Sequence, residues 1–192
     1  EAELVLKNAK IINVFTNEII TGDIAIEDGM IVGIGNYEGK QEHDMTGKYV
    51  CPGFIDSHLH LESTLVTPKE LVTAASRHGT TTFIVDPHES ANVSGLAGIN
   101  YILDQTEDAS ANVFVMMPSC VPATSIDDNG CTLTAEDMTQ YLDNERVLGL
   151  GEVMDYISVV NADPGMHRKL DLFKDKVRDG HAPFLAEEDL QA

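Results

Sequence analysis

The sequence predicts an α/β fold in which a short N-terminal β segment precedes a parallel sheet with crossover helices. From Val50 onward, apolar runs alternate with helical patterns, which is typical of parallel strands joined by helices. Before that point, short β-like runs follow one another with only turn residues between them. We therefore expect two domains, residues 1–49 and residues 50–192.

The N-terminal segment contains two stretches rich in β-branched residues, residues 3–14 and 18–35. Within the second stretch, Asp28-Gly29 separates two alternating apolar runs. An Asp-Gly pair between such runs is a strong hairpin signal. This part of the chain is therefore expected to form a small antiparallel sheet.

The second part carries helix-start signals between its apolar runs. Pro68 follows Thr67, and Thr134 precedes two acidic residues, patterns typical of the first turn of a helix. The strand runs are almost wholly apolar, as expected where both faces of a sheet are buried, although charged residues interrupt the last one. We expect strands over 49–56, 81–87, 112–118, 147–154 and 176–183, and helices over 68–77, 94–105, 134–144 and 164–174.

The charge of the chain bears on its partners. Twelve basic residues stand against 32 acidic ones, so the formal net charge is −20 and the sequence pI is about 4.4. Such a field repels phosphate backbones and anionic lipid. We expect no nucleic-acid or membrane partner, and the simplest interpretation of the acidity is a solvated acidic surface.

Cysteine usage and hydropathy suggest the compartment. Cys51, Cys120 and Cys131 are odd in number, widely spaced and free of any CxxC arrangement, which argues against a disulfide framework or a zinc ribbon. No stretch approaches the ~18 apolar residues of a membrane span, and the N-terminus lacks a signal-peptide pattern. We expect a cytoplasmic protein.

The stretch PGFIDSHLHLEST places two histidines, His58 and His60, at alternate positions near the end of a predicted strand. Side chains at i and i+2 of a strand project from the same face, and imidazole is a good ligand for zinc, iron, manganese or nickel. An HxH pair alone is a weak signal, because it also occurs as a surface pair. Its position at the carboxyl end of a parallel strand strengthens the hypothesis, since β/α barrels build active sites there.

Other ligand-type residues follow the later strands. Each has an ordinary interpretation: the DPHES stretch can be a turn with a helix cap, a glutamate can be a buried ion-pair partner, and a histidine can be a loop residue. Coincidence across several strands is harder to explain, so we expect these side chains to converge at one face. They are Asp86, His88, Glu89, Glu152 and His181.

The motifs together resemble a known family. The N-terminal β segment followed by PGFIDSHLH resembles the amidohydrolase superfamily, and within it the bacterial adenine deaminase family. The similarity rests on five motifs in order: HLHLESTLVTPKEL, HGTTTFIVDPHESANVSG, MMPSCVPAT, LGLGEVMDY and DGHAP. It implies a (β/α)₈ TIM-barrel-type metal-dependent hydrolase with an added β-sandwich, and hydrolysis of adenine to hypoxanthine and ammonia.

The resemblance also implies a binuclear site for Mn²⁺ or Fe²⁺, with Zn²⁺ possible. His58 and His60 would bind the more buried ion, Glu152 would bridge both ions, and His181 would bind the second. Asp86 is a further candidate ligand.

Roles in the reaction follow from the same resemblance. Glu152, His88 and Glu89 would be catalytic. Ser119 and Glu62 would bind the purine, and Asp56 would orient an imidazole, as carboxylates beside metal ligands commonly do.

The chain departs from that family in length. An eight-unit barrel needs about 250 residues, whereas the residues after the N-terminal segment suffice for about five β/α units. We therefore expect a fragment, completed by the remainder of a longer protein or by a homo-oligomer and inactive alone. The alternatives are another amidohydrolase acting on a cyclic amide or acetamide, such as a dihydroorotase, hydantoinase or N-acetylglucosamine-6-phosphate deacetylase, and a non-catalytic scaffold module.

Overall fold

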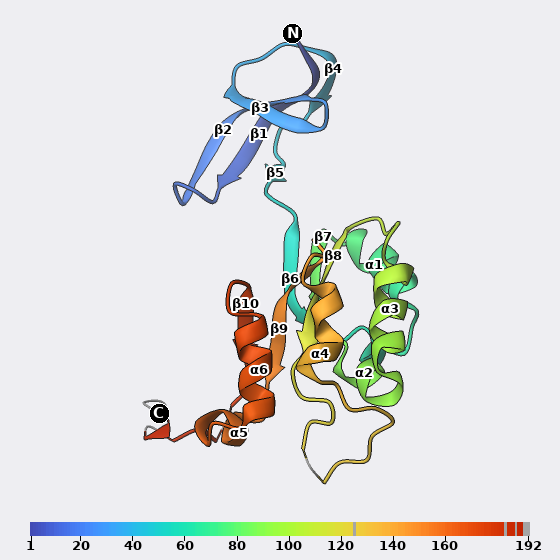
Figure 1. Ribbon diagram of the computed structural model, residues 1–192. Helices are drawn as coiled ribbons and strands as arrows, with labels where there is room; N and C mark the ends of the chain where they lie inside the picture. The colour runs from blue at the N-terminus through green and yellow to red at the C-terminus, as the bar shows by residue number, and fades with distance from the viewer. Residues whose placement is uncertain (125, 183, 187, 190–192) are drawn as a thin grey trace. The chain divides into compact units, whose positions relative to one another are not determined.

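The computed structural model describes residues 1–124, 126–182, 184–186 and 188–189. Within them the chain forms two compact units, residues 1–53 and residues 54–192 (Figure 1). No helix in the described ranges combines the length and the apolar character that crossing a bilayer requires.

The first unit is a five-stranded sheet with the order β3-β2-β1-β4, in which β5 also pairs with β1. The pairs β1–β2 and β2–β3 are antiparallel, but β4 and β5 run parallel to β1. The prediction of a small antiparallel sheet was therefore wrong for these two strands, because both run in the direction of β1, β4 along residues 2–7 and β5 along residues 10–11. The strands are β1 (Ala2–Asn13), β2 (Glu18–Glu27), β3 (Met30–Gly35), β4 (Gly39–Asp44) and β5 (Tyr49–Val50).

The Asp28-Gly29 hairpin is confirmed. It joins β2 to β3, and both residues have positive φ, 49° and 73°, as the two central positions of a type I′ turn require. The interior of this sheet is small: Val5 and Ala25 are fully buried, and Ile11 and Ile24 belong to a second cluster.

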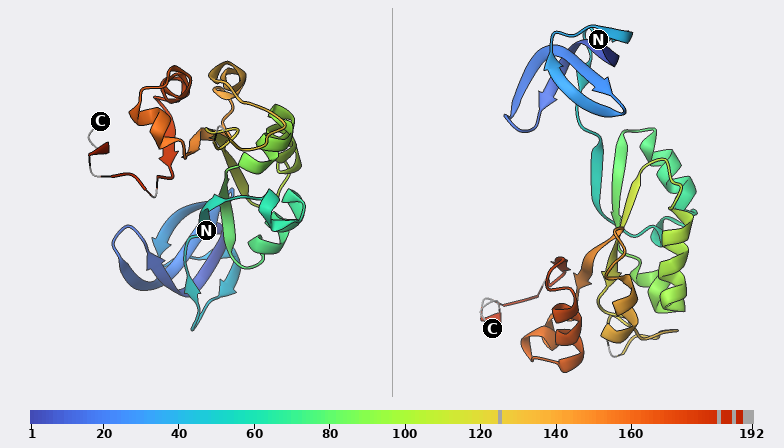
Figure 2. Two further views of the ribbon diagram at one scale, coloured as in Figure 1. Left: turned by 90° about the horizontal axis from the view of Figure 1, so that it is seen from below. Right: turned by 45° about the horizontal axis from the view of Figure 1, so that its top comes forward.

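The second unit contains a wholly parallel sheet with the order β10-β9-β8-β7-β6. Consecutive strands are neighbours, which is the arrangement of a β/α barrel, and the sheet curls as part of such a barrel (Figure 2). The prediction of an α/β fold with about five barrel units is confirmed. The strands are β6 (Phe54–Leu59), β7 (Thr80–Val85), β8 (Asn112–Pro118), β9 (Val147–Val153) and β10 (Val177–Gly180).

The residues expected to form one strand over 49–56 are divided between the two sheets. Tyr49–Val50 pairs with β1, and Phe54 begins β6. Pro52, which has no N–H to donate, separates the two segments.

The helices differ from the prediction in three places. The helix expected over 94–105 is present as α3, but a further helix, α2, precedes it and was not predicted; the two are separated at Gly95, where φ is 61°. The helix expected over 134–144 forms one α turn and then a 3₁₀ turn, and α5 was not predicted. The helical elements are η1 (Glu62–Thr64), α1 (Pro68–Ser76), α2 (His88–Ser94), α3 (Leu96–Gln105), α4 (Ala135–Met138), η2 (Thr139–Tyr141), α5 (Tyr156–Val160) and α6 (Pro164–Leu172).

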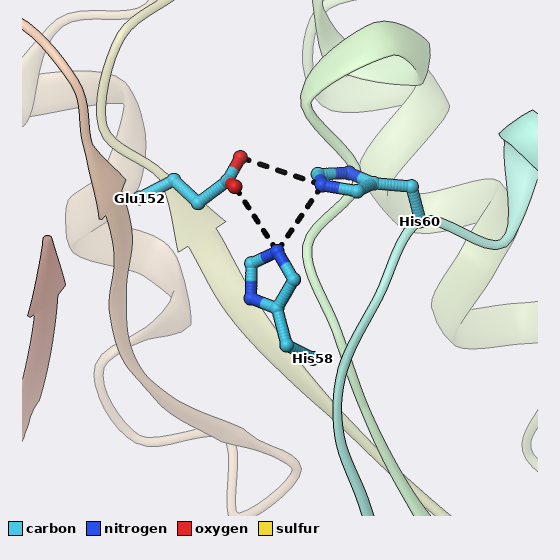
Figure 3. Close-up of side chains that lie close together, drawn as sticks. All are labelled: His58, His60 and Glu152. Atoms are coloured by element: carbon cyan, nitrogen blue, oxygen red, sulfur yellow. Dashed lines mark hydrogen bonds and ion pairs between the residues drawn. The ribbon is translucent and has the colours of Figure 1, made fainter. Parts of the chain in front are cut away.

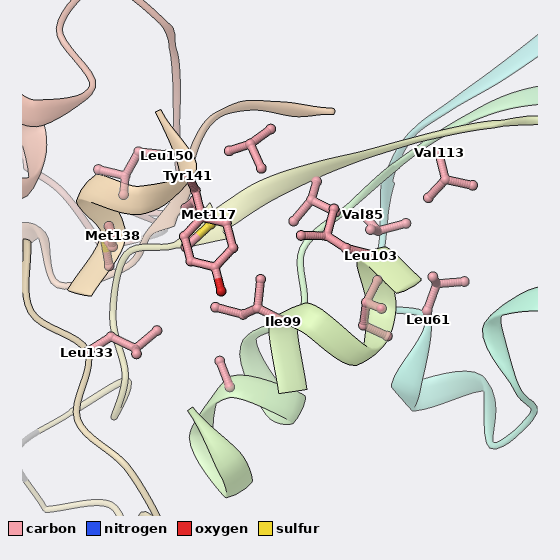
Figure 4. Close-up of a cluster of buried hydrophobic side chains, with 14 of the residues drawn as sticks. Leu61, Val85, Ile99, Leu103, Val113, Met117, Leu133, Met138, Tyr141 and Leu150 are labelled. Carbon is pink, nitrogen blue, oxygen red and sulfur yellow. The ribbon is translucent and has the colours of Figure 1, made fainter. Parts of the chain in front are cut away.

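The main core lies between the parallel sheet and its helices (Figure 4). Val85 and Met117 from the strands pack in one cluster with Ile99 from α3 and Met138 from α4. This packing fixes the strands relative to one another. The carboxyl ends of β6, β7 and β9 therefore hold fixed positions, and the candidate site lies there.

Candidate metal centre

The two histidines of the HxH motif converge at the carboxyl end of β6. His58 lies on β6 and His60 just beyond it, and their Nε2 atoms are 3.3 Å apart. The Nδ1 atom of His60 lies 2.7 Å from the backbone carbonyl oxygen of Asp86. Because a carbonyl oxygen only accepts, Nδ1 carries the ring proton, and Nε2 keeps its lone pair for a metal.

Glu152, at the end of β9, is the centre of the cluster (Figure 3). Its carboxylate lies 3.0 Å from His58 Nε2 and 3.4 Å from His60 Nε2. Two further imidazoles approach the same carboxylate: His88 at 3.4 Å and His181 at 3.8 Å, each through Nδ1. Three strand ends and the first turn of α2 thus supply the side chains expected to converge.

Asp86 and His88 form the buried side of the cluster. Asp86 is 1% exposed and His88 6% exposed, and His88 Nδ1 contacts Asp86 Oδ1. Gly151 makes room for this pair, because a Cβ there would stand 2.1 Å from Asp86 Oδ2. A side chain at position 151 would therefore displace the aspartate.

The donor atoms of this cluster fit divalent cations. Asp86 Oδ2 and His88 Nε2 are buried without a hydrogen-bond partner among the described residues, while Asp86 Oδ1 and His88 Nδ1 contact each other. Buried polar groups are normally paired. Ligands about 2.1 Å from one ion lie roughly 3.0–3.4 Å from each other, close to the separations seen here. Two groups that share Glu152 could hold an ion, namely His58, His60 and Glu152, and Asp86, His88 and Glu152; a third is His60, Glu62 and Glu89.

The electrostatics of the cluster follow from burial and from the density of carboxylates. Burial raises the pKa of Asp86, against the opposing effect of the His88 imidazole. For His60, burial acts to lower the pKa, but the carboxylates of Glu89 and Glu152 raise it overall. Several negative carboxylates thus lie close together, and a bound cation would offset their mutual repulsion.

Glu62 and Glu89 lie on the outer side of His60. The ligand atoms of these three residues are within 4.8 Å of one another, and Glu89 Oε2 is 3.3 Å from His60 Nδ1. Glu62 accepts the Ser90 N–H at 3.1 Å. Burial raises the pKa of Glu62, whereas for Glu89 the effect of burial is outweighed by the bond from Glu62 and by nearby imidazoles, so its pKa is lowered.

Three other expected site residues lie nearby with different contacts. Ser119 is fully buried, and its hydroxyl donates to the backbone carbonyl of Glu152 at 2.8 Å. Asp56 Oδ1 accepts the backbone N–H of His58 at 3.3 Å, so it contacts the chain next to the ligand. His181 is exposed, and its backbone N–H donates to Val153 at 3.2 Å.

Sequence reasoning missed one acidic neighbour and one lysine. Asp179 Oδ2 lies 3.9 Å from His58 Nδ1. Asp179 is at the end of the fifth strand, so the rule that found the other strand-end residues would have found it. Lys169, on α6, contacts the carbonyl of Ser119, and no sequence motif indicates that contact.

A cavity of about 580 Å³ opens beside the cluster. Its volume lies within the range of small-molecule sites. His60, His88, Glu89 and Glu152 line one part, and Asn92, Asp127 and Asp128 line another. A ligand in this cavity would therefore touch both the imidazole cluster and amide or carboxylate acceptors.

Comparison with known proteins identifies relatives over the whole chain. The sequence profile of the amidohydrolase family matches residues 49–189. A protein named adenine deaminase from Desulfitobacterium hafniense (strain Y51) is 60% identical over 192 residues, and one from Clostridium acetobutylicum is 52% identical over 194 residues. Each comparison covers 100% of this chain and 34% of the relative. The chain thus spans about a third of the length of the curated relatives it matches.

Solved structures show the same fold at low identity. The atrazine chlorohydrolase from Arthrobacter aurescens TC1, complexed with zinc, matches with a TM-score of 0.56 and 15% identity over 72% of this chain and 41% of that one. A D-aminoacylase matches with a TM-score of 0.55 and 19% identity over 81% of this chain and 39% of the other.

Proposed function

The chain belongs to the amidohydrolase family, and from this premise we propose that it supplies the first part of a metal-dependent site that hydrolyses adenine to hypoxanthine and ammonia. The observation that carries the proposal is the convergence of His58, His60 and His88 on Glu152 beside Asp86. The adenine specificity is supported by relatives of that name at 50–60% identity.

In this proposal His58 and His60 would hold one cation, His181 and Asp86 would contribute to a second, and Glu152 would be a ligand of both. Mn²⁺ or Fe²⁺ is the expected metal, although the donor set also suits Zn²⁺. When bound, such cations lower the pKa of water enough to supply a nucleophile near neutral pH.

Glu89 and His88 are the proposed proton carriers. Glu89 lines the cavity, and its carboxylate is ionised at neutral pH as that of an ordinary glutamate is, so it can accept the proton of the attacking water. The water oxygen bonds to C6 of the purine, and the proton passes to the exocyclic amino group. The C6–N bond then breaks, ammonia leaves, and hypoxanthine remains.

Ser119, Glu62 and Asp56 have supporting roles in the proposal. Glu62, whose ligand atoms lie close to those of His60 and Glu89, would contact the purine, while Ser119 and Asp56 hold the backbones of Glu152 and His58. Asp56 would also orient the His58 imidazole.

We also propose that the rest of a longer protein, or a second copy, completes the barrel. The described part of the parallel sheet ends at β6 and β10, each paired on one side, and open strand edges favour further pairing. A cytoplasmic location is proposed because Cys51, Cys120 and Cys131 are all free thiols, which suits a reducing compartment.

The test compares this chain with the complete protein. Bound metal is measured first, and ammonia release from adenine second. Metal in both proteins, with ammonia release in the complete protein, supports the proposal.

A metal-loaded complete protein that releases no ammonia from adenine but opens dihydroorotate or deacetylates N-acetylglucosamine 6-phosphate would contradict the adenine assignment. Absence of metal from both proteins would favour a non-catalytic scaffold. A Glu136→Ala variant, which removes an exposed carboxylate on α4, is the matched control for surface charge.

A further inference from the structure

Glu152 has an unusual backbone conformation. Its φ is 29°, in the left-handed region that side chains rarely adopt. A residue held there persists only where the surrounding structure imposes it. The carboxylate that lies within 4 Å of four imidazoles is therefore carried by a strained peptide, and some contact must hold that peptide.

Ser119 provides one such contact. Its hydroxyl donates to the backbone carbonyl oxygen of Glu152 at 2.8 Å, and the side chain is 0% exposed. Ser119 directly follows β8, and β8 is the neighbour of β9 in the sheet. Without water to compete, a buried hydroxyl fixes its acceptor more firmly than an exposed one would.

Ser119 is held in turn by Lys169. The ammonium group of this lysine, on α6, donates to the backbone carbonyl oxygen of Ser119 at 2.7 Å. Burial lowers the pKa of Lys169, against the effect of several nearby acidic groups. Removing an ammonium group from water costs free energy, because the group loses its hydration.

We propose that Lys169 is a positioning residue for the metal centre, acting through Ser119 on the backbone of Glu152. The inference rests on the proposed metal site and adds to it a residue of α6 that touches no metal ligand directly. The ammonium fixes the peptide of Ser119, and the hydroxyl of Ser119 fixes the carbonyl of Glu152. The Glu152 carboxylate is thereby aimed at His58 and His60.

The structure contains a matched comparison for this role. Lys176 Nζ donates to the carbonyl oxygen of Val147, also at 2.7 Å. Val147 begins β9, whereas Glu152 lies near its carboxyl end. The two lysines therefore make the same kind of bond at opposite ends of the neighbouring strands β8 and β9, but only the acceptor of Lys169, Ser119, bonds in turn to Glu152.

The experiment measures the affinity of the complete protein for Mn²⁺ alone, by competition with a chelator, in Lys169→Met, Ser119→Ala and Lys176→Met. We expect Lys169→Met and Ser119→Ala to weaken Mn²⁺ binding by about 10-fold or more, the usual effect of losing a contact behind a ligand. Lys176→Met should bind Mn²⁺ as the wild type does. The double variant Lys169→Met with Ser119→Ala should lose little more than either single variant, because both act on one pathway.

The inference would be overturned if Lys169→Met and Lys176→Met bound Mn²⁺ with equal affinity. It would also be overturned if the loss of affinity in the double variant equalled the sum of the losses in Lys169→Met and Ser119→Ala. Should Lys169→Met fail to fold, the Mn²⁺ affinity of Ser119→Ala is compared with that of Lys176→Met instead. Ser119→Ala removes a single oxygen, so we expect it to fold. The readout does not depend on adenine. A wild type that binds Mn²⁺ without releasing ammonia contradicts the adenine proposal alone, whereas a wild type that binds no Mn²⁺ contradicts both.

Discussion

Two buried aspartates, one in each compact unit, have opposite surroundings. Asp23 on β2 accepts bonds from the Lys7 ammonium at 2.6 Å, the Asn8 N–H at 2.9 Å and the Tyr37 N–H at 3.0 Å. These donors lower the pKa of Asp23 to about 2. Asp86 is buried as deeply, but Oδ1 contacts the His88 imidazole, Oδ2 has no hydrogen-bond partner among the described residues, and burial raises the pKa of this carboxyl.

We propose that the difference separates a structural carboxylate from a metal ligand. The chain provides Asp23 with donors from three residues, so its charge stabilises the small sheet. Around Asp86 and Glu152 the chain places imidazoles and further carboxylates. These groups are typical ligands of divalent cations. The buried carboxylate of the first unit is thus stabilised by hydrogen bonds and an ion pair from the chain itself. We propose that the buried carboxylate of the second unit is stabilised by a bound metal ion.

The largest expected effect comes from removing the centre of the cluster. Glu152→Ala should weaken metal binding by more than about 100-fold, beyond what loss of an outer contact causes, because Glu152 lies within 4 Å of four imidazoles. The measurement is metal content after dialysis against a weak chelator. Asp23→Asn is the control and should keep its metal; retention of metal by Glu152→Ala would remove the basis of the comparison.

Gly151→Ala tests the space that the cluster needs. The added Cβ would meet Asp86 Oδ2 at 2.1 Å and Met116 Cβ at 2.7 Å. We expect the free energy of unfolding of the second unit to fall by about 1–3 kcal/mol, as for other overpacked sites, with weaker metal binding. Urea unfolding and a metal titration check both parts. Wild-type behaviour in both would show that Asp86 has room to move.

The satisfied carboxylate should show a distinct pH dependence. Because the pKa of Asp23 is about 2 when folded and 3.8 in its ordinary state, the unfolded chain binds more protons between these values. Stability therefore rises with pH in that window. Its contribution is complete above about pH 4 and is lost as the pH falls toward 2.

Amide hydrogen exchange of β1 and β2 across this range measures that contribution. Asp23→Asn should remove this part of the pH dependence. The interpretation of Asp23 as a satisfied structural charge fails if the variant and the wild type show the same profile.

The smallest expected effect is at the hairpin glycine. Gly29 has φ of 73° and no atom within 4 Å of an added Cβ, so Gly29→Ala meets only backbone strain. We expect a loss of about 1 kcal/mol in the first unit and no change in metal binding. The contrast with Gly151→Ala, measured by the same two methods, distinguishes a glycine needed for conformation from one needed for space.

Much of the fold was readable from the sequence, because its signals are local. The Asp28-Gly29 turn and the apolar strand runs predicted the elements correctly. The parallel pairing of β4 and β5 with β1 was missed, since strand pairing depends on the path that the chain takes between strands. The helix at His88–Ser94 was also missed, because DPHES has the composition of a turn.

For the candidate site, the sequence predicted that His58, His60 and Glu152 lie together, and the structure brings them together. Strand-end positions made this possible, since parallel strands end at one edge of a sheet. The contacts of Ser119 and Lys169 could not be predicted in this way. They join residues 33 and 50 positions apart, and no spacing rule connects such residues.

The sequence by itself determined the alternation of strands and helices and the ligand-type residues at the strand ends, because both depend on local residue composition and hydrophobic periodicity. Only the tertiary structure decided which carboxylates receive donors and which face imidazoles. That outcome depends on which distant side chains share a buried volume, and burial is a property of the folded chain as a whole.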